Sequence, residues 1–179
     1  MKKTISIIML ISILSCIFIT GCTPKGNDGG DTVQVKLEDI HQKIKTAYGE
    51  NYKLSKKYTK EEVSQKFGIS SDSIKEVIAE GSDDDYDAFI AVQANDGKGE
   101  EVEKALKKHR EDLINNEGEG DNKYRYESSS VERFDDYVFF IMLGNGPVDS
   151  AIQGGEDLFN ALKEQTKIGI DTLKGIFNK

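Results

Sequence analysis

Two apolar runs constrain the fold more than any other feature of this chain. Residues 137–143 are Tyr-Val-Phe-Phe-Ile-Met-Leu, and residues 88–92 are Ala-Phe-Ile-Ala-Val. Neighbouring side chains of a strand point to opposite faces of a sheet, so each run presents apolar groups on both faces. The shorter run is therefore predicted to be an interior strand, and other elements must cover both faces of the longer one.

Weaker signals place helices and strands around these runs. Thr59 and Glu62 have the spacing of a capping box, which predicts a helix start, and Gly68 predicts its end. The expected elements are helices at 35–48 and 59–68, strands at 74–80 and 87–94, a helix at 100–115, a loop at 115–122, strands at 126–134 and 137–143, and a helical segment at 148–176. Because the strands form hairpin pairs, we expect an α+β domain with an antiparallel sheet of about four strands, on which the helices pack.

The C-terminal segment has apolar residues that alternate by four and three from Val148 to Ile176. This spacing predicts either one long helix or two helices that meet near Gly169. Its apolar stripe can cover the second face of the strand at 137–143, or it can bind a partner protein; we expect the first. The predicted domain spans residues 35–162, and residues 163–179 form a helical extension.

The N-terminal segment is typical of a secretion signal. Lys2 and Lys3 precede an apolar run over residues 5–19. The run ends in Ile19-Thr20-Gly21-Cys22, which resembles the lipobox of bacterial lipoproteins. That resemblance implies signal peptidase recognition of Ile19, Thr20 and Gly21, cleavage before Cys22, and a diacylglyceryl group on the Cys22 thiol.

Two alternatives to this processing site exist. Cys16 follows a similar motif, but cleavage there would shorten the apolar run to about ten residues, so Cys22 is preferred. An uncleaved N-terminal anchor is the other alternative. We therefore expect a signal peptide at 1–21, a lipidated flexible tether at 22–34, acyl chains such as palmitate, and a position on the extracytoplasmic face of the cell membrane.

Composition narrows the chemistry of the mature chain. The 24 basic and 32 acidic residues become 22 and 32 once Lys2 and Lys3 are removed, a net charge of −10. This balance argues against nucleic acid as a partner and against electrostatic adhesion to anionic lipid. Cys16 and Cys22 are the only cysteines, so the folded part has no disulfide, thiol nucleophile or cysteine metal site.

The sequence predicts no catalytic, cofactor or metal site. His109, beside Arg110 and near Glu111, is a weak functional candidate, because a general base also needs a partner within hydrogen-bond reach. A half-buried packing role is preferred for His109, and His41 on the first helix is no stronger a candidate.

Three polar motifs have structural interpretations. The acidic stretch at 83–87 lacks the spaced ligands of an EF-hand and is interpreted as a solvated hairpin turn. Gly97-Lys98-Gly99 only weakly resembles a phosphate-binding loop and is interpreted as a turn with a helix start. The serines at 128–130 are interpreted as part of an edge strand.

Several patterns together resemble one protein family over about residues 35–162. They are Asp87-Ala88-Phe89-Ile90, the helix over 102–113 with His109-Arg110, and Tyr137-Val138-Phe139. They are similar to an uncharacterised family of Gram-positive lipoproteins known as domain of unknown function 4358. Because the family has no assigned activity, the resemblance implies only a location and a fold.

Three functions are consistent with these observations. The preferred hypothesis is a non-catalytic binding or interaction module of the cell envelope, held at the membrane next to a protein partner. The alternatives are an extracytoplasmic enzyme that acts on an envelope component through carboxylate and histidine chemistry, and a small-solute binding protein. The last is disfavoured because a chain of this length lacks two lobes that could close on a solute.

Overall fold

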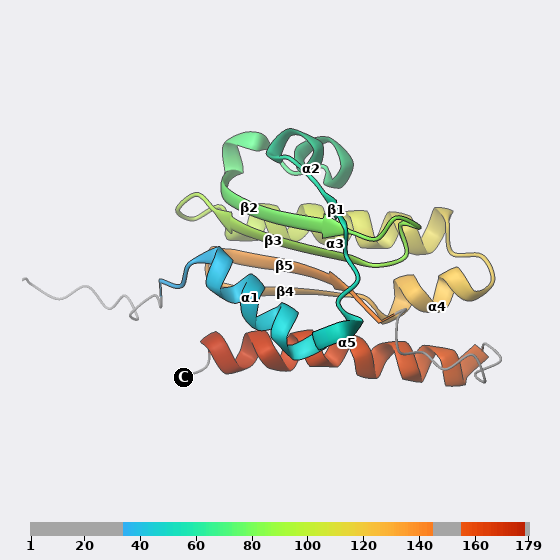
Figure 1. Cartoon of the computed structure of the whole chain (residues 1–179). Helices are drawn as coiled ribbons and strands as arrows, with labels where there is room; N and C mark the ends of the chain where they lie inside the picture. Colours follow the sequence, from blue (N-terminus) through green and yellow to red (C-terminus); the bar gives the residue numbers. More distant parts are fainter. Residues whose placement is uncertain (1–33, 145–154, 178–179) are drawn as a thin grey trace, which may run out of the picture. The chain divides into compact units, whose positions relative to one another are not determined.

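The computed structural model describes residues 34–144 and 155–177 (Figure 1). The elements are α1 (Leu37–Tyr48), a 3-10 turn (Gly49–Asn51), β1 (Lys56–Lys57), α2 (Lys60–Phe67), a second 3-10 turn (Ser71–Ser73), β2 (Ile74–Gly81), β3 (Ala88–Ala94), α3 (Gly99–Asn116), α4 (Asp121–Ser128), β4 (Ser130–Phe134), β5 (Tyr137–Met142) and α5 (Gly155–Phe177). The predicted signal peptide, Cys22, Val148 and Ile152 lie outside the described residues.

One antiparallel sheet of five strands organises the domain, in the order β1-β2-β3-β5-β4. The two apolar runs are the adjacent inner strands β3 and β5, with Ile90 opposite Phe140 and Val92 opposite Val138. The predicted α+β fold and both hairpins are confirmed. The fifth strand, β1, consists of two exposed lysines, and so short a polar stretch carries no strand pattern.

Helices cover both faces of the sheet (Figure 1). On one face, α2 and α3 contribute Val63, Phe67, Val102 and Leu106 to a buried cluster that includes Phe140. On the other face, α1 and α5 contribute Leu37, Ile40, Ile44, Leu173 and Ile176 to a cluster that includes Phe89, Phe139 and Ile141. The expectation that the C-terminal stripe covers the second face of β5 is therefore confirmed.

The helix α5 is continuous through Gly169, and the tertiary structure explains why a glycine occupies this position. The Tyr48 hydroxyl donates a hydrogen bond to the Gln165 carbonyl oxygen at 2.7 Å and accepts one from the Gly169 amide at 3.2 Å. A Cβ at position 169 would lie 3.1 Å from the Tyr48 hydroxyl and 3.2 Å from Ile141. The glycine therefore lets α1 and β5 approach α5 closely.

The prediction was wrong at residues 121–128. Where a loop and the start of a strand were expected, the chain forms the short helix α4, and the strand is confined to β4. Ser128 and Ser129 accordingly precede the edge strand, and only Ser130 belongs to it. The helix α4 buries only Tyr126 and Ser128, so it has too few apolar positions for its period to be recognised in the sequence.

The short helix α2 begins as predicted. The Glu62 amide donates to the Thr59 hydroxyl at 3.2 Å, and the Thr59 amide donates to the Glu62 carboxylate at 2.7 Å. This confirms the capping box, and Gly68 ends the helix in the left-handed conformation. Among the helices within residues 34–144 and 155–177, we find none that is long and apolar enough to traverse a bilayer.

Candidate binding cleft

A cleft of about 550 Å³ opens on the face of the sheet that α2 and α3 cover, beside the β2–β3 turn. Its lining comes from six parts of the chain. The lining residues are Tyr58, Lys66, Phe67, Asp84, Asp85, Tyr86, Asp87, Ala88, His109, Leu113, Glu117, Tyr126, Phe140 and Met142. Six of these side chains are aromatic rings, so the cleft combines flat apolar walls with a charged rim.

His109 lies in this cleft between two phenylalanine rings. Its ring centroid is 4.7 Å from that of Phe67 and 6.0 Å from that of Phe140, both edge to face. Burial lowers the pKa of His109, and the positive charge of Lys66 lowers it further. Among the described residues the His109 imidazole makes no hydrogen bond, so this neutral ring has no carboxylate that orients it for proton transfer.

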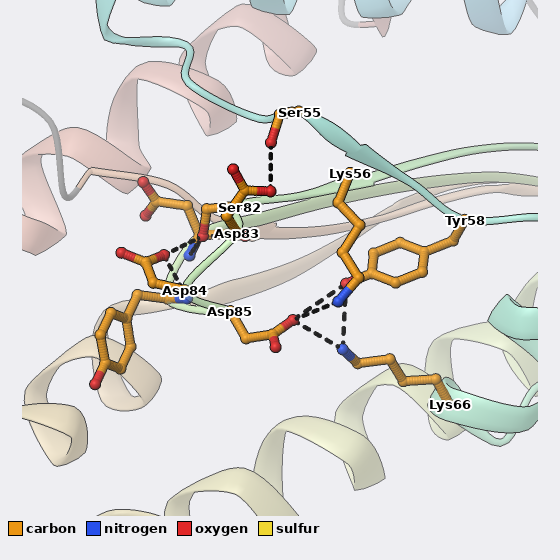
Figure 2. A network of polar contacts seen from close by, with 10 residues as sticks. Ser55, Lys56, Tyr58, Lys66, Ser82, Asp83, Asp84 and Asp85 are labelled. Carbon is orange, nitrogen blue, oxygen red and sulfur yellow. Dashed lines mark hydrogen bonds and ion pairs between the residues drawn. The ribbon is translucent and has the colours of Figure 1, made fainter.

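The rim is held by a network around Asp85, which consists of Lys56, Tyr58, Lys66 and Asp85 (Figure 2). One Asp85 carboxylate oxygen lies 3.5 Å from Lys56 Nζ, 3.3 Å from Lys66 Nζ and 3.3 Å from the Tyr58 hydroxyl. Burial acts to raise the pKa of Asp85, but the hydrogen bond and charge of Lys66 lower it overall. The network joins the β2–β3 turn to β1 and α2.

Local backbone geometry positions this network. Asp85 has a φ of 58°, a left-handed conformation that Asp tolerates better than most residues. A Cβ on Gly81 would lie 2.8 Å from the Tyr58 hydroxyl, so a larger residue at position 81 would displace the Tyr58 ring.

The acidic turn forms hydrogen bonds within the chain. Ser55 donates to Asp83 at 2.9 Å, and Ser82 donates to Asp84 at 2.6 Å (Figure 2). Asp83, Asp84 and Asp85 are exposed, as expected for a solvated hairpin turn, whereas Asp87 at the end of the predicted stretch is buried. Within the described ranges, no group of three or more His, Cys, Asp or Glu side chains is arranged to hold a metal ion.

The helix α4 supplies residues that the sequence did not indicate. Tyr126 lines the cleft, and the Arg125 guanidinium carbon lies 4.9 Å from the centre of the Tyr86 ring. One terminal nitrogen of Arg125 is buried and has no hydrogen-bond partner among the described residues. Because residues 121–128 were expected to be a loop and a strand, this contact to the turn could not be anticipated.

His41 lies on the opposite face of the sheet, so the structure does not bring the two histidines together. Its Nε2 atom is 3.1 Å from the Tyr52 hydroxyl and 3.2 Å from the Glu80 carboxylate, and Tyr52 donates to Glu80 at 2.9 Å. Burial raises the pKa of Tyr52, and the charge of Glu80 raises it further. The His41 ring also stacks on Phe89 at 6.0 Å. This buried cluster ties α1 to β2.

The predicted turn at Gly97-Lys98-Gly99 binds a carboxylate of the chain itself. Asp136 accepts a hydrogen bond from the Gly97 amide at 3.0 Å and another from the Gly99 amide at 2.9 Å. The helix α3 begins at Gly99, so the interpretation as a turn with a helix start is confirmed.

The central part of the sequence matches one known protein family. Residues 47–143 match the family described as Domain of unknown function (DUF4358), which is more than half of the chain. The chain belongs to this family. The DUF4358 match contains every residue that lines the cleft, whereas α5 lies outside it. No curated protein and no solved structure matches the chain.

Proposed function

We propose that this DUF4358 protein is a lipoprotein on the extracytoplasmic face of the cell membrane and that its domain is a non-catalytic binding module. The cleft around His109 is the observation that carries the binding role. Its volume of about 550 Å³ lies within the range of ligand sites, and it joins aromatic walls to a charged rim. The ligand in this proposal is a component of the cell envelope.

The surroundings of His109 favour binding over catalysis. A histidine that acts as a general base is normally oriented by a hydrogen-bonded partner and lies next to a nucleophile. The His109 ring instead packs against Phe67 and Phe140. A neutral imidazole in such a setting can offer a hydrogen bond to a ligand without performing chemistry on it.

The motif Ile19-Thr20-Gly21-Cys22 supports the anchor. Each buried methylene of an acyl chain contributes about 0.8 kcal/mol, so two or more chains on Cys22 suffice for stable membrane retention. A Gram-positive bacterial origin is part of the proposal and follows from the resemblance. The acidic composition gives no support to a nucleic-acid partner.

Mass spectrometry and fractionation test the anchor. The full chain, expressed in a Gram-positive host, is expected in the membrane fraction, without residues 1–21 and with an acylated Cys22. Cys22→Ser should abolish acylation, whereas the matched control Cys16→Ser should leave it intact. An unmodified Cys22 thiol in a chain that retains residues 1–21 would refute the proposed location.

Ligand screening tests the binding role independently. Envelope-derived small molecules and peptides that bind the folded chain should raise its unfolding temperature. For each such compound, amide chemical shifts should change around Ala88 and His109 and remain constant around Gly175 on the exposed side of α5. Compounds that stabilise the protein but perturb only α5 would argue against the cleft as the binding site.

A further inference from the structure

The side chains that line the cleft carry an excess of negative charge. Four of the lining residues are acidic and Lys66 is the single basic one among them; of the four, Asp87 is buried and its carboxylate already accepts a hydrogen bond from the Gly144 amide at 3.1 Å. Lys66 is already bound to the Tyr58 hydroxyl at 3.2 Å and to Asp85 at 3.3 Å. Lys56 and Arg125 flank the cleft, where Lys56 pairs with Asp85 and Arg125 lies over the Tyr86 ring. The carboxylates of Asp84 and Glu117 also belong to the lining residues and can attract a cationic ligand.

The tyrosine rings at the cleft already hold cations of the protein itself. Lys66 Nζ lies 4.9 Å from the centre of the Tyr58 ring, and the Arg125 guanidinium carbon lies 4.9 Å from that of Tyr86. The electron-rich face of an aromatic ring attracts a cation, and a desolvated contact strengthens that attraction. Tyr126, Phe67 and Phe140 add further aromatic surface inside the cleft.

We infer that the cleft binds a small organic cation that carries an apolar, preferably aromatic, body. The charged group lies toward the carboxylates of the turn and Glu117, and the apolar body lies against Phe67, Phe140 and His109. This inference rests on the proposed binding function and names its ligand class. A neutral apolar molecule would contact the same aromatic walls but would gain no electrostatic attraction from the carboxylates.

Three indole compounds that differ in charge test this inference on the full-length chain. Tryptamine, tryptophol and indole-3-acetate share one ring and are positive, neutral and negative at neutral pH. The chain contains no Trp, so the indole fluorescence of each probe can be followed in titrations against a protein-free blank. Tryptamine is expected to bind about three- to tenfold more tightly than tryptophol, and indole-3-acetate most weakly.

A pair of variants tests the role of the rim. Glu117→Gln removes a carboxylate that lines the cleft, and it should weaken tryptamine binding about two- to threefold while leaving tryptophol binding unchanged. Glu119→Gln is the matched control, because Glu119 is exposed nearby but does not line the cleft. Added salt should reduce the preference for tryptamine, because it screens charges on the surface.

The outcomes separate this inference from the proposed function. If indole-3-acetate binds at the cleft as tightly as tryptamine, the ligand class is wrong but the binding role stands. If none of the three probes binds, or if tryptamine shifts only amides away from the cleft, the inference is overturned. The broader ligand screen then decides whether the cleft binds anything.

Discussion

At the scale of single residues, burial determines the chemistry of His109. The imidazole packs against Phe67 and Phe140, and burial together with the Lys66 charge lowers its pKa, while the Asp112 charge opposes the shift. An unfolded chain releases His109 from these surroundings, so its pKa returns to about 6.5. The folded and unfolded states therefore differ in proton uptake at this residue.

This difference predicts a pH-dependent contribution to stability. As pH falls below about 6.5, the unfolded chain binds a proton at His109 that the folded chain resists, so the free energy of unfolding decreases. Urea unfolding of the wild type and of His109→Asn, at several values from about pH 7.5 to pH 5, should show a steeper loss in the wild type. His41 is present in both proteins. If the free energy of unfolding falls equally with pH in both, His109 makes no such contribution.

The surroundings of His109 could be predicted in part from the sequence, whereas those of His41 could not. His109 was recognised as a partly buried helix residue because its neighbours Leu106 and Leu113 share its stripe. The cluster of His41, Tyr52 and Glu80 was missed because Glu80 is 39 positions from His41 and contact depends on strand placement. Local spacing describes the face of one helix, but it carries no information on which strand lies beneath that face.

At the scale of elements, α5 shows how two glycines of one helix can have opposite roles. Gly169 lies against Tyr48 and Ile141, whereas a Cβ on Gly175 would have no neighbour within 4 Å. An exposed glycine inside a helix costs about 1 kcal/mol relative to alanine. Substitution by alanine should therefore have opposite effects on the free energy of unfolding at the two positions.

Gly175→Ala is expected to raise the free energy of unfolding by about 0.5–1 kcal/mol, because it improves helix propensity without a new contact. Gly169→Ala is expected to lower it by about 1–3 kcal/mol, because the added methyl group pushes α5 away from Tyr48 and Ile141. Thermal and urea unfolding of both variants measure this contrast. A stabilised Gly169→Ala variant would show that the close approach at position 169 is not required.

At the scale of the whole molecule, both faces of the central sheet need a cover. The helix α5 buries Leu158, Leu162, Leu173 and Ile176, and each such side chain contributes about 1.5–3 kcal/mol when removed from water. Four of these contributions rival the net stability of a typical domain, about 5–15 kcal/mol. The family match at residues 47–143 therefore ends before an element that the fold of this chain needs.

We expect a chain that ends after residue 144 to aggregate or to remain unfolded, because the apolar face formed by Phe139 and Ile141 would keep only α1 and lose the part of its cover that α5 supplies. A chain that ends after residue 177 is the matched control and should fold like the complete protein. Size-exclusion chromatography and circular dichroism distinguish the two results. A monomeric, cooperatively folding chain that ends after residue 144 would contradict the assigned role of α5.

The amino-acid sequence by itself determined the inner strands, both hairpins and the capped start of α2. Such features depend on the alternation of side chains and on contacts within a few residues, and both are visible along the chain. Only the tertiary structure decided the cleft, the choice between the two alternatives for the C-terminal stripe, and the partners of His41. The cleft joins side chains from Tyr58 to Met142, and its geometry depends on strand register and helix packing, which arise only when distant segments bury their apolar faces together.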